Sequence, residues 1–273
     1  MSEEKIYSKS DLCSESAPKR SPLELSSQLY RRYASLGLET SKTSNIHYVD
    51  GSTVVMAGGT SVRMFNVLTS ESRYLESVGG GGIGAIAVSH DKKFIAVAER
   101  SITESPPNIY VYEYPSLKIY RVLRNGTERL YSALAFNTSD TKLASVGAFP
   151  DFMLTVWDWK QEKIILRNKA FSQDIFKVSF FPEDDGILTT SGTGHIRFWK
   201  MAQTFTGLKL QGEIGKFGKF DLSDVDGYAE MPSSGMILSG SESGSLLLWD
   251  GNFVKLEVLR GDHNKPHDGM FLS

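Results

Sequence analysis

An aromatic residue that ends a short β-type run recurs about every 45 residues along most of this 273-residue chain. Each repeat consists of an apolar run, a polar turn, a run ending in small residues, a tight turn, a run ending in the aromatic, and a last run. The recurring aromatics are Phe65, Tyr112, Trp157, Trp199 and Trp249. Four short strands per unit at this period predict an all-β fold of the β-propeller kind.

The repeat constrains the fold because a single four-stranded sheet cannot bury both of its faces. Such sheets therefore stack face to face as blades around an axis. Small residues of the second strand, such as Ala144 and Ser145, fit the tight space near that axis. Five blades are visible within residues 44–273, and Met270-Phe271-Leu272 has the pattern of one more first strand. The sequence allows five closed blades, but its unfinished end favours an incomplete propeller.

The last unit carries Ser239-Gly240 followed by Trp249-Asp250, and it resembles the WD repeat of WD40-type propellers. WD repeats usually carry an Asp before the third strand and a Gly-His pair between blades. Ser243 stands in the place of that Asp, and most units lack the Gly-His pair. We therefore expect the polar tetrad of these repeats to be largely missing, with core packing providing most of the stability.

The amino-terminal segment, residues 1–43, has a different composition, because ten of its residues are Ser. We predict that it is disordered apart from a short helix over residues 22–36. Ser21-Pro22-Leu23-Glu24 has the form of a helix start, and an apolar stripe with helical spacing follows it. This helix either docks on a partner or packs on its own domain, and packing is the favoured alternative.

Composition argues against several classes of function. The chain has 30 Lys and Arg against 32 Asp and Glu, a net charge of −2, which does not suit a general nucleic-acid binder. No apolar stretch approaches the roughly 18 residues of a transmembrane helix. Cys13 is the only cysteine, so an internal disulfide and a multi-cysteine zinc site are excluded. We expect a cytoplasmic or cytoskeletal protein with no nucleic-acid or membrane partner.

Three motifs have the form of chemical sites but lack the context that the chemistry needs. Gly79–Gly84 matches G-x-G-x-x-G, yet a strand follows it where a dinucleotide site requires a helix. His263 and His267 have metal-ligand spacing, but no cysteine pair accompanies them. Gly240–Gly244 has Glu242 where a nucleophile elbow has its nucleophile. We predict no enzyme activity, no catalytic, cofactor or metal residues, and no small-molecule substrate.

One segment interleaves basic and aromatic residues, a pattern that suits an acidic peptide or a single-stranded nucleic acid. Its members are Lys209, Lys216, Phe217, Lys219 and Phe220. Four acidic residues lie close to it in the sequence, namely Glu213, Asp221, Asp224 and Asp226. Because these acids offset the positive charge, a solvated loop is the favoured interpretation.

Two further segments are candidates for partner contacts. The insertion Glu99–Asn108 lengthens a turn of the second unit and either meets a partner or is merely tolerated length. Trp157-Asp158-Trp159-Lys160 resembles the W-D-x-R box of substrate receptors of cullin-type ubiquitin ligases. A Lys at the last position cannot make the bidentate contact of an Arg. A ligase adaptor is therefore the alternative function and not the leading one.

Four segments carry a more specific resemblance, namely Gly79–Val88, Tyr112–Lys118, Trp157–Arg167 and Phe205–Gly212. They look like the amino-terminal propeller of the cilia- and flagella-associated protein 44 family, and the likeness covers roughly residues 45 to 270.

The resemblance implies a large non-enzymatic component of the ciliary or flagellar axoneme. In that family the protein belongs to the tether assembly that holds inner-arm dynein heads to the doublet microtubule and supports flagellar motility. By this resemblance the chain is a scaffold whose partners are the tether components and the doublet microtubule. Family members continue with more propeller and a coiled coil, which implies that this chain is a fragment or a short form.

Overall fold

Short runs rich in β-branched, aromatic and small residues form the β-strands of this protein in a computed structural model. The structure describes residues 37–39, 42–240 and 244–258. The predicted helix over residues 22–36, the predicted strand Met270-Phe271-Leu272 and the His263/His267 pair lie outside the described residues.

The strands group into five sheets of four, which we call blades 1 to 5. Blade 1 contains β1 (Ile46–Tyr48), β2 (Thr53–Gly58), β3 (Ser61–Asn66) and β4 (Ser72–Glu76). Blade 2 contains β5 (Ile83–Val88), β6 (Phe94–Glu99), β7 (Ile109–Glu113) and β8 (Ile119–Leu123). Blade 3 contains β9 (Tyr131–Phe136), β10 (Leu143–Gly147), β11 (Met153–Asp158) and β12 (Lys163–Lys169). Blade 4 contains β13 (Ile175–Phe181), β14 (Asp184–Gly192), β15 (His195–Thr204) and β16 (Gly207–Ile214). Blade 5 contains β17 (Tyr228–Met231), β18 (Met236–Gly240), β19 (Leu246–Asp250) and β20 (Phe253–Val258).

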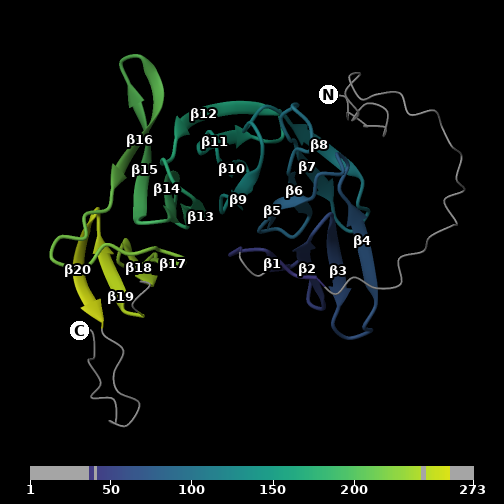
Figure 1. The fold of residues 1–273 in the computed structure, drawn as a ribbon, viewed down its shortest axis with the longest axis horizontal. Helices are drawn as coiled ribbons and strands as arrows, with labels where there is room; N and C mark the ends of the chain where they lie inside the picture. Colours follow the sequence, from purple (N-terminus) through teal and green to yellow (C-terminus); the bar gives the residue numbers. More distant parts are fainter. Residues whose placement is uncertain (1–36, 40–41, 241–243, 259–273) are drawn as a thin grey trace, which may run out of the picture.

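Within each blade, every strand pairs antiparallel with the next strand along the chain. The first strands of the blades lie toward the centre of an arc, and blades 1 and 5 stand at its two ends (Figure 1). The prediction of an all-β, WD40-type propeller with about five four-stranded blades is confirmed. In the described part of the chain the arc is open, and a continuation into a longer propeller stays a prediction.

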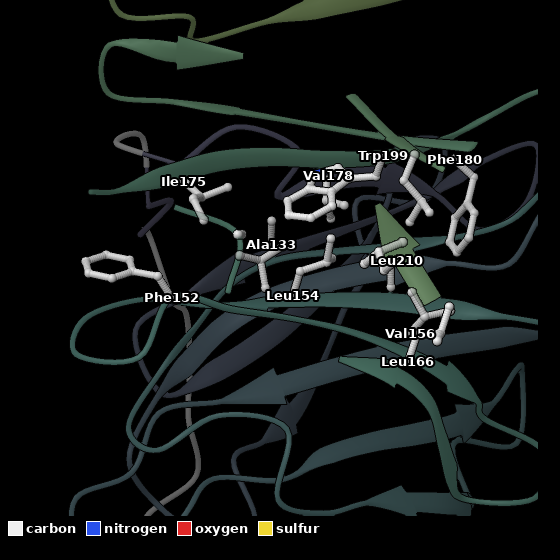
Figure 2. Close-up of a cluster of buried hydrophobic side chains, with 14 residues drawn as sticks. Ala133, Phe152, Leu154, Val156, Leu166, Ile175, Val178, Phe180, Trp199 and Leu210 are labelled. Atoms are coloured by element: carbon white, nitrogen blue, oxygen red, sulfur yellow. The ribbon is translucent and has the colours of Figure 1, made fainter. Parts of the chain in front are cut away.

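The core lies between the blades, as the stacking argument requires. Between blades 3 and 4, side chains of β9, β11 and β12 face side chains of β13, β15 and β16 (Figure 2). Leu154, Val156 and Leu188 are completely buried in this cluster, and Trp199, its largest side chain, is 1% exposed. Similar clusters join blades 1 and 2, blades 2 and 3, and blades 4 and 5.

The five recurring aromatics all lie on the third strand of a blade, as predicted. Tyr112, Trp157, Trp199 and Trp249 are at most 3% exposed, and each belongs to the cluster that its blade shares with the blade before it. Phe65 is only half-buried, with the Arg63 guanidinium 4.7 Å from its ring centroid. The difference follows from position, because no described blade precedes blade 1 to cover Phe65.

The polar tetrad is better preserved than the sequence predicted. The indole Nε1 of each Trp on a third strand donates to a hydroxyl on the neighbouring second strand in three blades. The pairs are Trp157 with Ser145 at 2.8 Å, Trp199 with Thr190 at 2.9 Å, and Trp249 with Ser239 at 2.8 Å. In blade 3 the Thr127 hydroxyl also donates to Asp151 at 2.7 Å, which links the loop before the blade to the turn between β10 and β11. All three blades thus keep the Trp-to-hydroxyl bond, and blade 3 adds the Asp bond with Thr127 in the place of a His. The expectation of a largely missing tetrad was wrong for the Trp-to-hydroxyl bond, while in blades 4 and 5 the described residues show no bond of the Asp-to-His kind.

We expect Ser145→Ala to lower the free energy of unfolding by about 1–3 kcal/mol, because it leaves the buried Trp157 N–H without its acceptor. Urea unfolding followed by circular dichroism measures the change. Ser234→Ala is a matched control at an exposed turn, where the expected change is within about 0.5 kcal/mol. Equal effects at the two serines would contradict the role of this hydrogen bond.

Candidate functional site

The strand order places two sets of loops on opposite faces of the arc. Because strands alternate in direction, turns between second and third strands share one face with the connections between blades. We call this the connection face. The other two turns of each blade lie on the opposite face, which we call the turn face. Loop tips on these faces and the edges of the arc are where a propeller presents side chains to other molecules.

The glycine-rich segment Gly79–Gly84 lies on the connection face, between blades 1 and 2. The Glu99 carboxylate, which is buried, accepts hydrogen bonds from the backbone N–H groups of Val78 at 2.5 Å and Gly79 at 2.9 Å. Burial raises the pKa of Glu99 in spite of these bonds. A Cβ on Gly81 would lie 1.9 Å from the Arg100 carbonyl oxygen, so close backbone packing explains the glycine. β5 begins at Ile83, so the segment enters a strand and not the helix that a dinucleotide site needs.

The insertion within Glu99–Asn108 forms the loop between β6 and β7 on the same face. Its Ile102 side chain is 69% exposed, and Phe149, in the corresponding turn of blade 3, is 71% exposed. The loop is held to the next blade by a hydrogen bond from Ser101 N to Arg129 O at 2.8 Å. The insertion is thus a loop held to blade 3 that exposes an apolar side chain. This structure is compatible with a partner contact and equally with an insertion that is merely tolerated.

The segment that precedes β1 crosses the centre of the connection face. Lys42 Nζ donates to the carbonyl of Gly84 in blade 2, and Thr43 Oγ1 donates to the carbonyl of Phe176 in blade 4 at 2.8 Å. Beside these contacts lies a cavity of about 190 Å³. Burial, with a smaller contribution from the positive charge of Arg100, lowers the pKa of Lys42 to about 8. This segment therefore ties non-adjacent blades together at the axis.

The W-D-x-K segment lies at the end of β11 and in the turn that follows it. Trp159 is fully buried, and its Nε1 donates to the Asp140 carbonyl at 3.1 Å. Lys160 is exposed, with its Nζ 5.2 Å from the Trp159 ring centroid. Trp159 thus packs inside the propeller, and Lys160 is the most exposed member of the segment.

Blade 4 carries a long hairpin, β15–β16, whose outer half projects beyond the other strands (Figure 1). Leu210, midway along this hairpin, is buried in the cluster between blades 3 and 4. Phe205 at the tip is fully exposed. Phe205 belongs to one of the four segments that carry the family resemblance, and it is the most exposed large apolar side chain among the described residues.

The basic and aromatic residues of the sequence pattern separate in the structure. Phe217 is buried against Trp249, with ring centroids 5.1 Å apart, and Lys209 lies on the β15–β16 hairpin. Lys216, Lys219 and Phe220 line a groove of about 570 Å³ together with Phe253 and Lys255 of β20. We call this the basic groove. Sequence reasoning missed Phe253 and Lys255 because no spacing rule relates them to the loop before β17.

Across residues 37–39, 42–240 and 244–258, no three His, Cys, Asp or Glu side chains gather in a way that could hold a metal ion. No described segment forms a helix with the length and apolar character that a membrane crossing requires.

Comparison with known proteins identifies the family of this chain. Over 235 residues, 86% of the chain, it is 50% identical to cilia- and flagella-associated protein 44 of Mus musculus. The chain belongs to the cilia- and flagella-associated protein 44 family. The relative of the same name in Chlamydomonas reinhardtii is also 50% identical, over 238 residues and 85% of the chain. Family membership confirms the resemblance and places the chain among the cilia- and flagella-associated proteins.

The chain spans only about an eighth of the length of these relatives, 12% of the mouse protein and 13% of the algal one. A more distant relative is echinoderm microtubule-associated protein-like 4 of Xenopus laevis, which is 30% identical over 187 residues, 66% of the chain and 20% of that protein. No family model matches the chain. The described blades are thus one part of what a full-length family member contains.

Proposed function

We propose that the chain is a non-enzymatic propeller scaffold of the ciliary or flagellar axoneme. The observation that carries this proposal is the 50% identity to cilia- and flagella-associated protein 44 over 86% of the chain. The fold supports it, because rigid stacked blades hold loop tips such as Ile102 and Phe205 at fixed positions for partners.

The proposed partners are components of the inner-arm dynein tether and the doublet microtubule, and the proposed role is support of flagellar motility. The relative named as a microtubule-associated protein supports a partner of the microtubule class. Phe205 at the tip of the β15–β16 hairpin is our first candidate contact, because it is fully exposed. An aromatic side chain that fills a pocket on a partner contributes strongly to binding.

We expect the tagged chain, expressed at native level in a flagellated cell, to remain with the axoneme after detergent extraction. Phe205→Ser is expected to reduce the retained fraction severalfold, because it removes an apolar contact without touching the core. The matched control is Phe149→Ser, a change of the same kind at an exposed turn of another blade. Immunoblots of the extracted axoneme and of the detergent-soluble fraction measure the distribution.

Complete release of the wild-type chain by detergent would overturn the axonemal proposal. Co-purification with the adaptor of a cullin-type ligase, abolished by Lys160→Ala, would favour the alternative instead. Equal retention of wild type and Phe205→Ser would keep the axonemal function but reject Phe205 as the contact.

A further inference from the structure

The basic groove beside the outer strand of blade 5 is a site that the family name does not explain. β20 forms the outer edge of blade 5, at the end of the arc (Figure 1). We propose that the basic groove binds an acidic segment of a partner protein in an extended conformation. The inference rests on the proposed scaffold function only in taking the ligand to be a protein.

Local packing creates the groove. Phe217 is anchored in the core against Trp249, and Lys216 N donates to the Asn252 carbonyl at 2.7 Å. Lys216 also forms a parallel bridge with Phe253, the first residue of β20. Gly218, at φ +64°, then turns the chain at this point. The loop and the strand are therefore joined at one end, and the groove lies between them.

The edge of β20 offers backbone hydrogen-bonding groups to a ligand. β20 pairs with β19 on one side, and in the described chain the bridge to Lys216 is the only strand-like pairing on its other side. An exposed strand edge is a template for an extended peptide, which adds as a further strand. The edge thus supplies affinity for any peptide, and the lining side chains supply selectivity.

The lining favours negative charge, with three lysines against one acidic residue, Glu257. Lys216 Nζ lies 4.7 Å from the Phe253 ring centroid, and Lys219 Nζ lies 5.4 Å from that of Phe220. Neither ammonium has a carboxylate within ion-pair distance in the part of the chain that the structure describes. Lys255 pairs with Asp250 at 3.3 Å, but an exposed pair of this kind is worth little and yields readily to a ligand.

The acidic residues that offset the charge in the sequence do not line the groove. Glu213, Asp221 and Asp226 are exposed outside it. Asp224 accepts a hydrogen bond from the Gly194 N–H at 2.8 Å, in the turn between β14 and β15. Its carboxylate is therefore engaged by blade 4. None of these four acids is among the residues that line the groove, so its lining keeps three lysines against Glu257.

A peptide suits this groove better than a nucleic acid. Stacking of successive bases needs a series of free aromatic faces. Here Phe217 is buried, Lys219 Nζ lies over the Phe220 ring, and Phe253, with Lys216 Nζ over its ring, is the one aromatic of the lining that is more than half exposed. Apolar side chains of a peptide need only the edges of these rings and the aliphatic stems of the lysines. An extended segment that alternates acidic and apolar residues matches both parts of the lining.

The test uses the purified full chain and a short fluorescent peptide of alternating glutamate and valine, with fluorescence anisotropy at low ionic strength. The double variant Lys216→Glu/Lys219→Glu is expected to weaken binding about tenfold, because two attractions become repulsions. Lys200→Glu/Lys209→Glu makes the same charge change at two exposed positions outside the groove and should leave binding unchanged. Salt should weaken wild-type binding.

Three results would overturn the proposal. They are no binding of the peptide at low ionic strength, an equal loss in the two double variants, and tighter binding of a single-stranded oligonucleotide that is lost in the groove variant. The peptide assay uses purified chain and tests the groove alone. The detergent-extraction experiment in cells tests the axonemal proposal, so the two proposals can fail separately.

Discussion

Replacing Trp159 with alanine is expected to lower the free energy of unfolding by about 3–5 kcal/mol. The side chain is fully buried after the end of β11. Its ring centroid lies 4.9 Å from that of Phe94 and 5.5 Å from that of Phe136, both in edge-on geometry. Because Phe94 belongs to blade 2 and Phe136 to blade 3, the cavity left by alanine would open between two blades.

Two further variants separate the contribution of the hydrogen bond from that of side-chain packing. Trp159→Phe keeps a ring but removes the hydrogen bond to the Asp140 carbonyl, so a smaller loss of about 1–3 kcal/mol is expected. Phe205→Ala removes a fully exposed ring and should change stability by no more than about 0.5 kcal/mol. Urea unfolding followed by far-ultraviolet circular dichroism measures all three. A loss at Trp159→Ala as small as that at Phe205→Ala would show that this indole does not hold blades 2 and 3 together.

Gly192→Ala is expected to destabilise the chain by about 3 kcal/mol or more, at the upper end of the range for overpacked sites. A Cβ at this position, the last residue of β14, would lie 2.0 Å from the Asp174 carbonyl oxygen and 2.8 Å from the Ile175 Cα. Both atoms belong to the backbone at the start of the adjacent strand β13. Rotation of a side chain cannot relieve such a clash, so the strand itself must move.

Gly240→Ala is the matched control, because Gly240 is the last residue of β18 and so occupies the same place in blade 5. A Cβ there would meet no atom of the described residues within 4 Å. Since alanine also restricts the unfolded chain, the expected effect is neutral or stabilising by up to about 1 kcal/mol. Soluble yield and urea midpoints of the two variants provide the comparison. Equal stability of the two variants would contradict the close approach of β13 and β14 at Gly192.

Most of the blade architecture could be predicted from the sequence, because strand pairing within a blade is local. The spacing of Tyr112, Trp157, Trp199 and Trp249 predicted the period of the repeat and the place of the third strand in blades 2 to 5. In the structure these four side chains are buried, as that prediction requires. The Trp-to-hydroxyl bonds were missed although they too are local. Ser145, Thr190 and Ser239 precede their Trp partners by 12, 9 and 10 residues, and the lengths of the intervening turns set which hydroxyl meets the indole.

The candidate groove shows what the sequence could not determine. The sequence shows that Lys216 and Lys219 are basic residues beside aromatics, but it also has Asp224 five positions after Lys219. Only in the folded chain does the Asp224 carboxylate accept a hydrogen bond from Gly194. Only there does Lys255 line one groove with Lys216 and Lys219. The period of the sequence alone determined that the chain forms blades, because each blade is closed by hydrogen bonds between neighbouring strands. The tertiary structure decided which charges share a surface, because residues about forty positions apart meet only when the strands have paired and the blades have stacked around the axis.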